Sequence, residues 1–431
     1  MKLWPWPTRC KEATSPLVRE LDARKRNPRE VIGELRRPGG FLSEEVRDAA
    51  RRIVEDVRER GDEAVLEYTK RFSGVRPEPM RVPPEEIERA REALPAETEE
   101  SFRVAIENVR FFHKREMGRS WETSRGGATV GQRVRPLRRV GIYVPGGHGA
   151  YPSSLFMSAV PAQVAGVREI CVCVPPGLDG KVNKWVLAVA GLLGLEEVHA
   201  AGGTQAMGAM AFGTESIAPV NKIVGPGNDY VIAAKLEVFG VVGIDAPQGP
   251  SDVVVIADSS AFPERVARDL MAQAEHLSGA SSVLLSPSAE LVEAVEPLLS
   301  GEPAEHISLV RVRDLAQAAE ISNHYAPEHA HVISEDWEAV MNDLREVGMV
   351  GVGDFSPIAL SDYAAGPSHV LPTDGTAAWA SPRSVNDFIT HTNYMHFTQE
   401  ALENLAPHVE RLARLEGLEN HAESVAVRRK Y

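Results

Sequence analysis

Cysteine is scarce in this sequence, with three residues in 431, at Cys10, Cys171 and Cys173. A small, odd number in a long chain speaks against a disulfide framework and favours a reducing compartment. Cys171 and Cys173 stand in the apolar run 170–174, which is typical of a strand, where alternate residues face the same way. We therefore expect both thiols in the core, with a metal or redox role as the less favoured alternative.

The sequence also lacks long apolar runs and an excess of positive charge. Nothing approaches the roughly 18 apolar residues of a membrane span, and segment 1–7 has no apolar core of a signal peptide. We expect a cytoplasmic protein without a membrane partner. The 47 Lys and Arg against 61 Asp and Glu give a net charge of −14. This balance argues against a nucleic-acid partner and weakly favours a cationic substrate.

What is present is the composition and pattern of an α/β protein. Hydrophobic residues make up 43% and charged residues 25%, as in ordinary soluble domains. Residues 16–120 have helical spacing, with Ser43 as one N-cap candidate. From Arg139, short apolar runs alternate with helical segments, which predicts parallel sheets joined by crossovers. The expected strands are 140–145, 169–174, 197–201, 222–224, 253–257, 282–286 and 331–334.

We expect these strands to form two sheets that divide near residue 240. The first part carries glycine-rich loops, and the second carries the clusters of ionisable residues. The tail from about residue 380 is helical again, with an apolar stripe in phase at Leu402, Leu405, Val409, Leu412 and Leu415.

The ordinary dinucleotide fingerprint, Gly-x-Gly-x-x-Gly after the first strand, is absent. In its place, glycine-containing loops follow three strands, at 146–149, 202–205 and 225–228. Glycine lets a ligand approach the backbone, and the helix N-termini after such loops favour phosphate oxygens. The loops are compatible with nucleotide binding or with tight turns alone.

Four residues far apart in the sequence form a candidate metal site. Gln273 and His276 are three residues apart on an expected helix and therefore share a face. Asp362 could add a carboxylate and His421 a second imidazole. Two imidazoles with oxygen donors suit zinc or another borderline divalent metal, although spacing alone does not bring the four together.

The pair Glu328-His329 directly follows Pro327, which disfavours the helical region for Ala326. The pair therefore begins at a bend, and neighbouring side chains diverge on a helix or a strand. Such a carboxylate and imidazole could flank one substrate, one handling water while the other takes a proton. The alternative is that Glu328 caps a helix and His329 is a satisfied surface histidine.

Taken together, these motifs resemble the histidinol dehydrogenase family over roughly residues 30–428. The matching strings, in chain order, are Val140-Gly-Ile-Tyr-Val-Pro-Gly-Gly, Ala150-Tyr-Pro-Ser-Ser, Gly202-Gly-Thr-Gln-Ala, Gly213-Thr-Glu-Ser, Val224-Gly-Pro-Gly-Asn, Gly249-Pro-Ser, Ala272-Gln-Ala-Glu-His, Tyr325-Ala-Pro-Glu-His, Asp362-Tyr-Ala-Ala-Gly, His369-Val-Leu-Pro-Thr and Glu416-Gly-Leu-Glu-Asn-His. The family oxidises L-histidinol to L-histidine through the aldehyde, using two NAD+ in succession. The resemblance therefore implies a zinc-dependent, NAD-dependent four-electron dehydrogenase of the last steps of histidine biosynthesis.

The resemblance also implies roles for single residues. Glu328 resembles the base that activates water for the aldehyde step, and His329 the base for the alcohol and hydrate protons. The ligands of one Zn2+ per subunit would be Gln273, His276, Asp362 and His421. The NAD+ contacts would be Tyr143, Gln205 and Asn228. The substrate contacts would be Ser251 and Glu416 with His329 and the four zinc ligands, and His369 would also line the site.

The family fold has two incomplete Rossmann-like domains with parallel sheets and small helical extensions, assembled as an intertwined homodimer. By resemblance, residues 31–138 and 245–380 would form the first domain, with the catalytic and metal residues. Residues 139–244 would form the second, which binds NAD+. Residues 1–30 and 381–431 would be the N- and C-terminal helical extensions. Glu416 and His421, both in the C-terminal extension, would reach the partner's active site.

Several residues depart from the family pattern and leave the substrate open. Leu277 stands where Asp or Gly is usual, and Ala330 and His331 stand where Leu and an acid are common; Gln248 and Trp379 also differ. One alternative is a related NAD-dependent alcohol dehydrogenase for another small polar alcohol, such as a sulfonated diol. An anionic substrate of that kind would need Arg or Lys near the pocket. The remoter alternative is a non-catalytic metal- or nucleotide-binding module.

Overall fold

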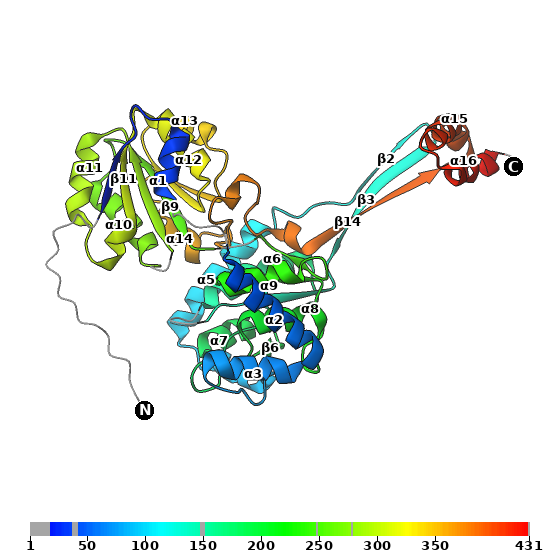
Figure 1. Ribbon diagram of the computed structural model, residues 1–431, viewed down its shortest axis with the longest axis horizontal. Coiled ribbons are helices and arrows are strands. Elements are labelled where there is room, and N and C mark those ends of the chain that lie inside the picture. Colours follow the sequence, from blue (N-terminus) through cyan, green and yellow to red (C-terminus); the bar gives the residue numbers. More distant parts are fainter. Residues whose placement is uncertain (1–17, 37–41, 147–150, 247–248, 277–278, 430–431) are drawn as a thin grey trace.

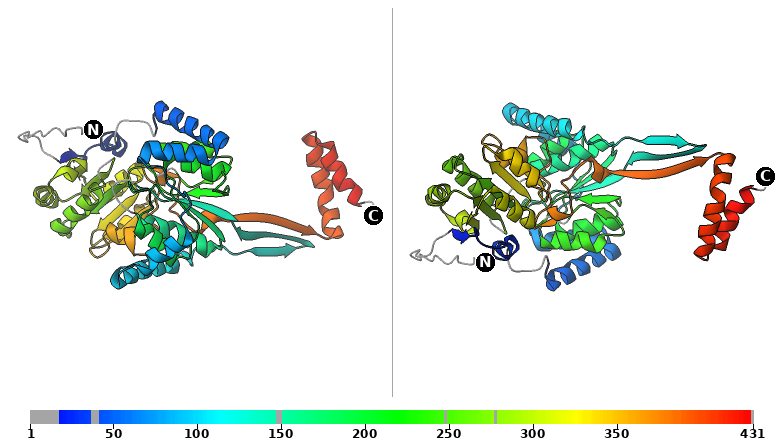
Figure 2. Two further views of the ribbon diagram at one scale, coloured as in Figure 1. Left: turned by 90° about the horizontal axis from the view of Figure 1, so that it is seen from below. Right: turned by 90° about the horizontal axis from the view of Figure 1, so that it is seen from above.

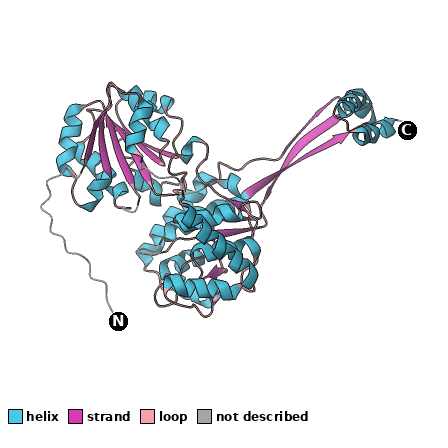
Figure 3. Cartoon of the chain, viewed as in Figure 1, coloured by secondary structure: helices cyan, strands magenta, loops and turns pink. Residues whose placement is uncertain are grey.

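The structure, a computed structural model, describes residues 18–36, 42–146, 151–246, 249–276 and 279–429. Two α/β lobes lie next to each other, and a long arm projects from one of them and carries the C-terminal helices (Figure 1, Figure 3). In this part of the chain, no helix has the length and apolarity to cross a membrane. The expected α/β class with parallel sheets is confirmed.

The first lobe is built on a six-stranded parallel sheet in the order β1-β11-β10-β9-β12-β13. The central strand β9 is buried along its whole length, as expected for a parallel strand covered on both faces. Its residues alternate between two clusters, so that Val253 and Val255 face one helical layer while Val254 and Ile256 face the other. The strands are β1 (Arg19–Asp22), β9 (Asp252–Ala257), β10 (Ser281–Ser286), β11 (Ile307–Arg311), β12 (His329–Ile333) and β13 (Met349–Val352).

Helices cover both faces of this sheet. One face packs against α10 (Pro263–Ala274) and α11 (Ala289–Val295). The other packs against α1 (Pro28–Leu35), α12 (Leu315–Tyr325) and α13 (Trp337–Asp343).

The second lobe is built on a five-stranded parallel sheet in the order β6-β5-β4-β7-β8. Cys171 and Cys173 are fully buried in β5, on the face covered by α8 (Gly203–Phe212) and α9 (Asp229–Val238), so the expected core placement is confirmed. The strands are β4 (Arg139–Tyr143), β5 (Glu169–Cys173), β6 (Val198–His199), β7 (Lys222–Val224) and β8 (Gly243–Ile244).

Eight helices of the described chain pack around this second sheet. One layer contains α4 (Pro84–Glu92), α5 (Ala96–His113), α6 (Pro152–Ala165) and α7 (Lys184–Leu192). The other contains α2 (Glu44–Arg60), α3 (Asp62–Ser73), α8 (Gly203–Phe212) and α9 (Asp229–Val238).

The arm is an antiparallel sheet that ends in two helices. Its order is β14-β3-β2, with β2 (Trp121–Arg125), β3 (Ala128–Pro136) and β14 (Ile389–Phe397). The helices α15 (Gln399–Leu415) and α16 (Glu419–Ala426) form its tip. Figure 2, seen from below and from above, shows the tip well away from both lobes.

Three expectations about chain segments need correction. Within 31–138, α2 to α5 pack on the five-stranded sheet and not on the sheet of 245–380, because their apolar stripes contact the helices and strands of the second lobe. The described part of 1–30 includes β1, which pairs with β11 at the edge of the six-stranded sheet. The extension 381–431 is not only helical, because β14 pairs with β3. The division between the sheets falls between Ile244 and Asp252, close to the expected position.

Candidate active site

A cavity of about 220 Å³ lies where the two lobes meet. On one side are residues that follow β4 and β7, at the carboxyl edge of the five-stranded sheet. On the other side are residues at the amino ends of β9 and β12, in the six-stranded sheet. The cavity brings together these residues singled out from the sequence: Ser251, Gln273, His276, Glu328, His329, Asp362 and His369.

Glu328 is held at the start of β12 by an exchange of hydrogen bonds with Asp252. The Glu328 N–H donates to the Asp252 carboxylate (2.7 Å), and the Asp252 N–H donates to the Glu328 carboxylate (3.1 Å). Burial and the Asp252 carboxylate raise the pKa of Glu328 well above its ordinary value. The expected bend is confirmed, because α12 ends at Tyr325 and Ala326 adopts a positive φ of 47°. The Glu328 carboxylate accepts a hydrogen bond from the first N–H of β9, so the alternative that Glu328 caps a helix is wrong.

His329 is a buried, neutral imidazole. It is 3% exposed, and neither ring nitrogen has a hydrogen-bond partner. Its Nδ1 lies 3.8 Å from a Glu328 carboxylate oxygen, and its Nε2 lies 3.6 Å from a carboxylate oxygen of Asp362. Burial and the nearby His369 lower the pKa of His329 to about 3. The ring is therefore uncharged and both of its nitrogens face the site without a partner, and the alternative of a surface histidine is wrong.

Three of the four predicted metal ligands, Gln273, His276 and Asp362, line this cavity. Gln273 lies in the last turn of α10, is buried, and has an amide nitrogen without a partner. His276 follows in the turn after α10, and Asp362 lies on α14 (Ile358–Tyr363), where burial raises its pKa to about 6. The amide oxygen of Gln273, the imidazole of His276 and the carboxylate of Asp362 supply oxygen and nitrogen donors of the kind that a zinc-type cation takes.

The fourth predicted ligand, His421, and the predicted substrate contact Glu416 are not near this cavity in the same chain. Glu416 follows α15 and His421 lies in α16, and both are exposed at the tip of the arm. One chain therefore supplies an incomplete set of the predicted residues.

A second cavity, of about 630 Å³, gathers the three predicted NAD+ contacts, Tyr143, Gln205 and Asn228. Residues of all three glycine-containing loops line it, so these loops converge on one cavity. The Tyr143 hydroxyl accepts a hydrogen bond from the Gly203 N–H (3.2 Å), and Asn228 caps α9. Tyr68 and Phe72 of α3, which stack on each other, form part of the wall.

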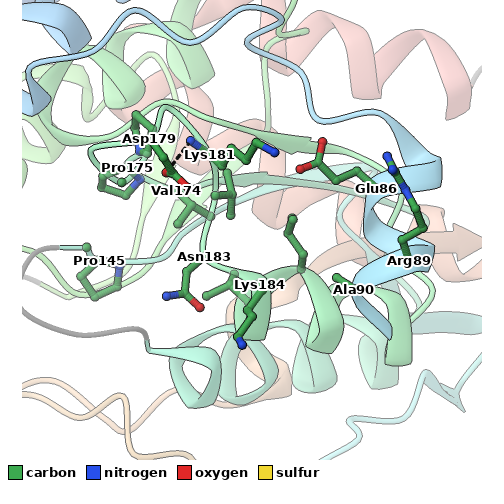
Figure 4. A pocket seen from close by; sticks show the side chains of 16 residues that line it. Glu86, Arg89, Ala90, Pro145, Val174, Pro175, Asp179, Lys181, Asn183 and Lys184 are labelled. Atoms are coloured by element: carbon green, nitrogen blue, oxygen red, sulfur yellow. Dashed lines mark hydrogen bonds between the residues drawn. The ribbon is translucent and has the colours of Figure 1, made fainter. Parts of the chain in front are cut away.

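A third cavity, of about 790 Å³, lies between α4, α7 and the loop that follows β5 (Figure 4). Glu86 and Arg89 come from α4, and Lys184 comes from the start of α7. The cavity shares Pro145 with the first cavity and Pro175 with the second. None of the predicted site residues lines it, and its charged side chains are of both signs.

His369 lines the cavity, and Asp252 contacts Glu328 without lining the cavity itself. The His369 Nδ1 lies 2.7 Å from the main-chain oxygen of Asp362, and burial lowers the pKa of His369 to about 4. Asp252 was missed in the sequence, although it directly follows Ser251 in a matching string. The sequence feature that could have identified it is a carboxylate at the first position of an otherwise apolar strand.

None of the described residues that depart from the family pattern lines the 220 Å³ cavity. His331 lies 2.8 Å from Asp269 of α10 and 2.9 Å from the main-chain oxygen of Gly353, and neither it nor Ala330 lines the cavity. Trp379 is 70% exposed. Leu277 and Gln248 lie outside the described residues.

Comparisons with known proteins extend over the same elements. A family model described as histidinol dehydrogenase matches residues 40–429. Histidinol dehydrogenase from Geobacillus kaustophilus is 44% identical over 412 residues, which cover 91% of this chain and 96% of the relative. That from Bacillus subtilis is 42% identical over 400 residues, covering 90% and 94%. The crystal structure of histidinol dehydrogenase from Elizabethkingia anophelis superposes with a TM-score of 0.91 at 32% identity, covering 96% of this chain and 99% of that chain.

Proposed function

Because the chain belongs to the histidinol dehydrogenase family, we propose that it oxidises L-histidinol to L-histidine through the aldehyde, with NAD+ as the hydride acceptor in both steps. The observation that carries the proposal is the pair Glu328 and His329. Both side chains are buried, and both face the cavity between the lobes.

In the alcohol step, His329 is the base. The substrate hydroxyl gives its proton to a ring nitrogen of His329 while the carbon-bound hydrogen leaves as hydride to NAD+. A base for this step must be unprotonated and have a free lone pair. The unpartnered ring nitrogens of His329, which lie near the carboxylates of Glu328 and Asp362, support that role.

In the aldehyde step, Glu328 activates water. Its carboxylate takes a proton from the water that adds to the carbonyl carbon, and the carbonyl oxygen takes the proton that His329 gained in the first step, which yields the hydrate and returns His329 to its neutral form. His329 then takes the proton of a hydrate hydroxyl as the second hydride leaves to a second NAD+. The raised pKa of Glu328 supports this role, because a carboxylate of ordinary pKa is a weak base.

Gln273, His276 and Asp362 would hold a zinc ion together with His421 of a second copy. When bound, the ion would orient the substrate and polarise a nearby oxygen. The convergence of an amide, an imidazole and a carboxylate on one cavity supports this assignment. The contact of His331 with Asp269, which lies one turn before Gln273 on α10, would help to fix that helix.

The arm supports a homodimer in which each tip completes the partner's site. The predicted apolar stripe of α15 faces solvent in the single chain, with Leu405, Val409, Leu412 and Leu415 between 40% and 77% exposed. An exposed apolar stripe of this length marks a protein interface. Packing these helices on a second copy would bury the stripe and bring Glu416 and His421 towards the other cavity.

The cavity lining favours histidinol over an anionic alcohol. No Lys or Arg lines the 220 Å³ cavity in the described chain, although a sulfonated diol would need one. Glu416 would suit the ammonium group of histidinol. We assign the 630 Å³ cavity to NAD+ because it gathers three loops at the carboxyl ends of parallel strands.

Initial rates test this function directly. The protein should reduce NAD+ with L-histidinol and not with a sulfonated diol, and chelation should remove activity and metal together. A variant that ends after Phe397 lacks α15 and α16 and should lose both as well. A tail-less protein that keeps metal and activity contradicts the dimeric site, and a preference for the sulfonated diol contradicts the substrate.

A further inference from the structure

A second group of metal-ligand side chains lies in the five-stranded sheet, away from the catalytic cavity. Strand β5 carries Cys171-Val-Cys173, and the chain at β6 reads Glu197-Val-His199. The two strands are parallel neighbours, with Val172 opposite Val198 and Cys173 opposite His199. Because alternate residues share a face of a sheet, the cysteines, the glutamate and the histidine lie on the same side.

The donor atoms of Cys171, Glu197 and His199 all lie within 4.8 Å of one another. Within the described chain, this is the one such group of His, Cys, Asp and Glu residues. Cys171 and His199 are fully buried. The separations are compatible with three side chains that share one small cation.

His199 is the observation that points to a ligand. Its Nε2 lies 3.2 Å from a Glu197 carboxylate oxygen, but its Nδ1 is buried and has no hydrogen-bond partner. A buried imidazole nitrogen without a hydrogen-bond partner is costly, and a bound ion is one of its few explanations. The proposed cation would take one nitrogen of this ring as a ligand.

We propose that Cys171, Glu197 and His199 form a second, structural metal site for a divalent cation of the zinc type. Thiolate, imidazole and carboxylate are the donors that Zn2+ prefers. Binding displaces any proton on the ligating atoms of Cys171 and His199, which is released to water. The thiolate and the Glu197 carboxylate supply two negative charges, and Glu197 shares its charge with the Arg139 guanidinium.

Arg139 has the position of an outer partner of this site. Its guanidinium donates two hydrogen bonds to the Glu197 carboxylate, at 2.9 and 2.5 Å, and a third to Glu169 at 3.3 Å. Hydrogen bonds of this kind orient a ligating carboxylate. Arg139 begins β4, whereas Tyr143 at the other end of that strand lines the 630 Å³ cavity. The proposed site is therefore separate from NAD+ and from the catalytic residues.

The site would link one of the two short edge strands to the rest of the sheet. Strand β6 is two residues long and lies at the sheet edge. The cation would join it to β5 by side chains as well as by main-chain hydrogen bonds. The same segment leads into the loop 202–205 of the 630 Å³ cavity.

Cobalt substitution tests the proposal, because none of the proposed catalytic ligands contains sulfur. In the holoenzyme with its metals exchanged for Co2+, the second site should give a thiolate-to-cobalt charge-transfer band in the near ultraviolet. Metal analysis should find two equivalents per chain. A Cys10→Ser variant, which removes the one thiol outside β5, should keep the band.

The Cys171→Ser variant, made in the Cys10→Ser background, should lose the band and one metal equivalent while it keeps L-histidinol oxidation. A His199→Asn variant should behave in the same way. A single equivalent without a thiolate band in the unmutated protein overturns the proposal, and so does a band that survives in Cys171→Ser. If Cys171→Ser fails to fold, the spectrum and metal content of the unmutated protein still decide.

Discussion

Replacing Asp252 by Asn should change how the stability of the protein depends on pH. Burial raises the pKa of the Asp252 carboxyl to about 7, against an ordinary value of 3.8. In the unfolded chain the same group releases its proton near its ordinary pKa. Between these two pH values the native state binds more protons than the unfolded state, so wild-type stability falls as pH rises.

The size of the effect follows from the two pKa values. A difference between 3.8 and about 7 corresponds to about 4 kcal/mol, of which about 3 kcal/mol falls between pH 5 and pH 8. Asn does not titrate, so the variant should gain up to that amount relative to the wild type over this range. Loss of an acceptor for the Asp374 N–H adds a constant cost of about 1 kcal/mol, which changes the offset and not the slope.

The assay is urea unfolding at several pH values between 5 and 8, followed for both proteins at one protein concentration. Asp258, just after the opposite end of β9, provides the matched control. Burial opposes the effect, but hydrogen bonds from Ser260 and Ser334 lower the pKa of Asp258. Because Asp258 is ionised in both states above pH 5, Asp258→Asn should give a flat difference. If the Asp252→Asn difference is equally flat, the account of the carboxyl pair is wrong.

The remaining predictions concern the catalytic cavity and the cofactor. Glu328→Gln should slow oxidation of the aldehyde by at least about 100-fold while alcohol oxidation continues, which a single-turnover NADH assay can separate; equal losses in both steps would contradict the assignment. His276→Asn should lose both bound zinc and activity, and a metal-replete variant would remove His276 from the ligand set. Tyr143→Phe removes the hydroxyl that accepts from Gly203 and should raise the KM for NAD+ several-fold with a smaller change in kcat, so an unchanged KM would exclude that contact. Asp252→Asn should move the acidic limb of the aldehyde-step profile to lower pH, because the Asp252 carboxylate raises the pKa of Glu328.

The parts of the fold that local pattern determines were predicted from the sequence. Strands such as β7 and β10 are short apolar runs bounded by turns, and the structure has them at the expected positions. The helix that begins after Ser43 is confirmed with its cap, since the Ser43 hydroxyl accepts from the Val46 N–H. These features depend on neighbours within a few residues.

The parts that depend on distant partners were not predicted. β14 contains the strand-favouring residues Ile, Thr, Tyr and Phe, but its pairing with β3 joins segments about 250 residues apart, which local pattern does not specify. The helices α2 to α5 have apolar stripes, but a stripe does not specify which sheet it covers. Here that sheet is the five-stranded one.

The candidate site was predicted further than the fold, because its motifs are short strings at recognisable positions. Glu328 and His329 were found from the bend at Pro327, and their burial in one cavity agrees with that reading. Asp252 was missed because its role depends on the register between β9 and β12, in which Val253 pairs with His329. The remote position of His421 could be inferred only by resemblance, since nothing in its local sequence separates it from the cavity.

The central claim is that each active site is built from two chains, and subunit complementation tests it most directly. Glu328→Gln blocks the aldehyde step in the cavity of its own chain, while His421→Asn disables the site to which its arm contributes, so neither variant alone should form L-histidine. After the two variants are unfolded and refolded together, half of the dimers should be mixed, and each mixed dimer should contain one intact site. The rate of L-histidine formation should return to about a quarter of the wild-type value. A mixture that forms mixed dimers and stays inactive contradicts the shared site.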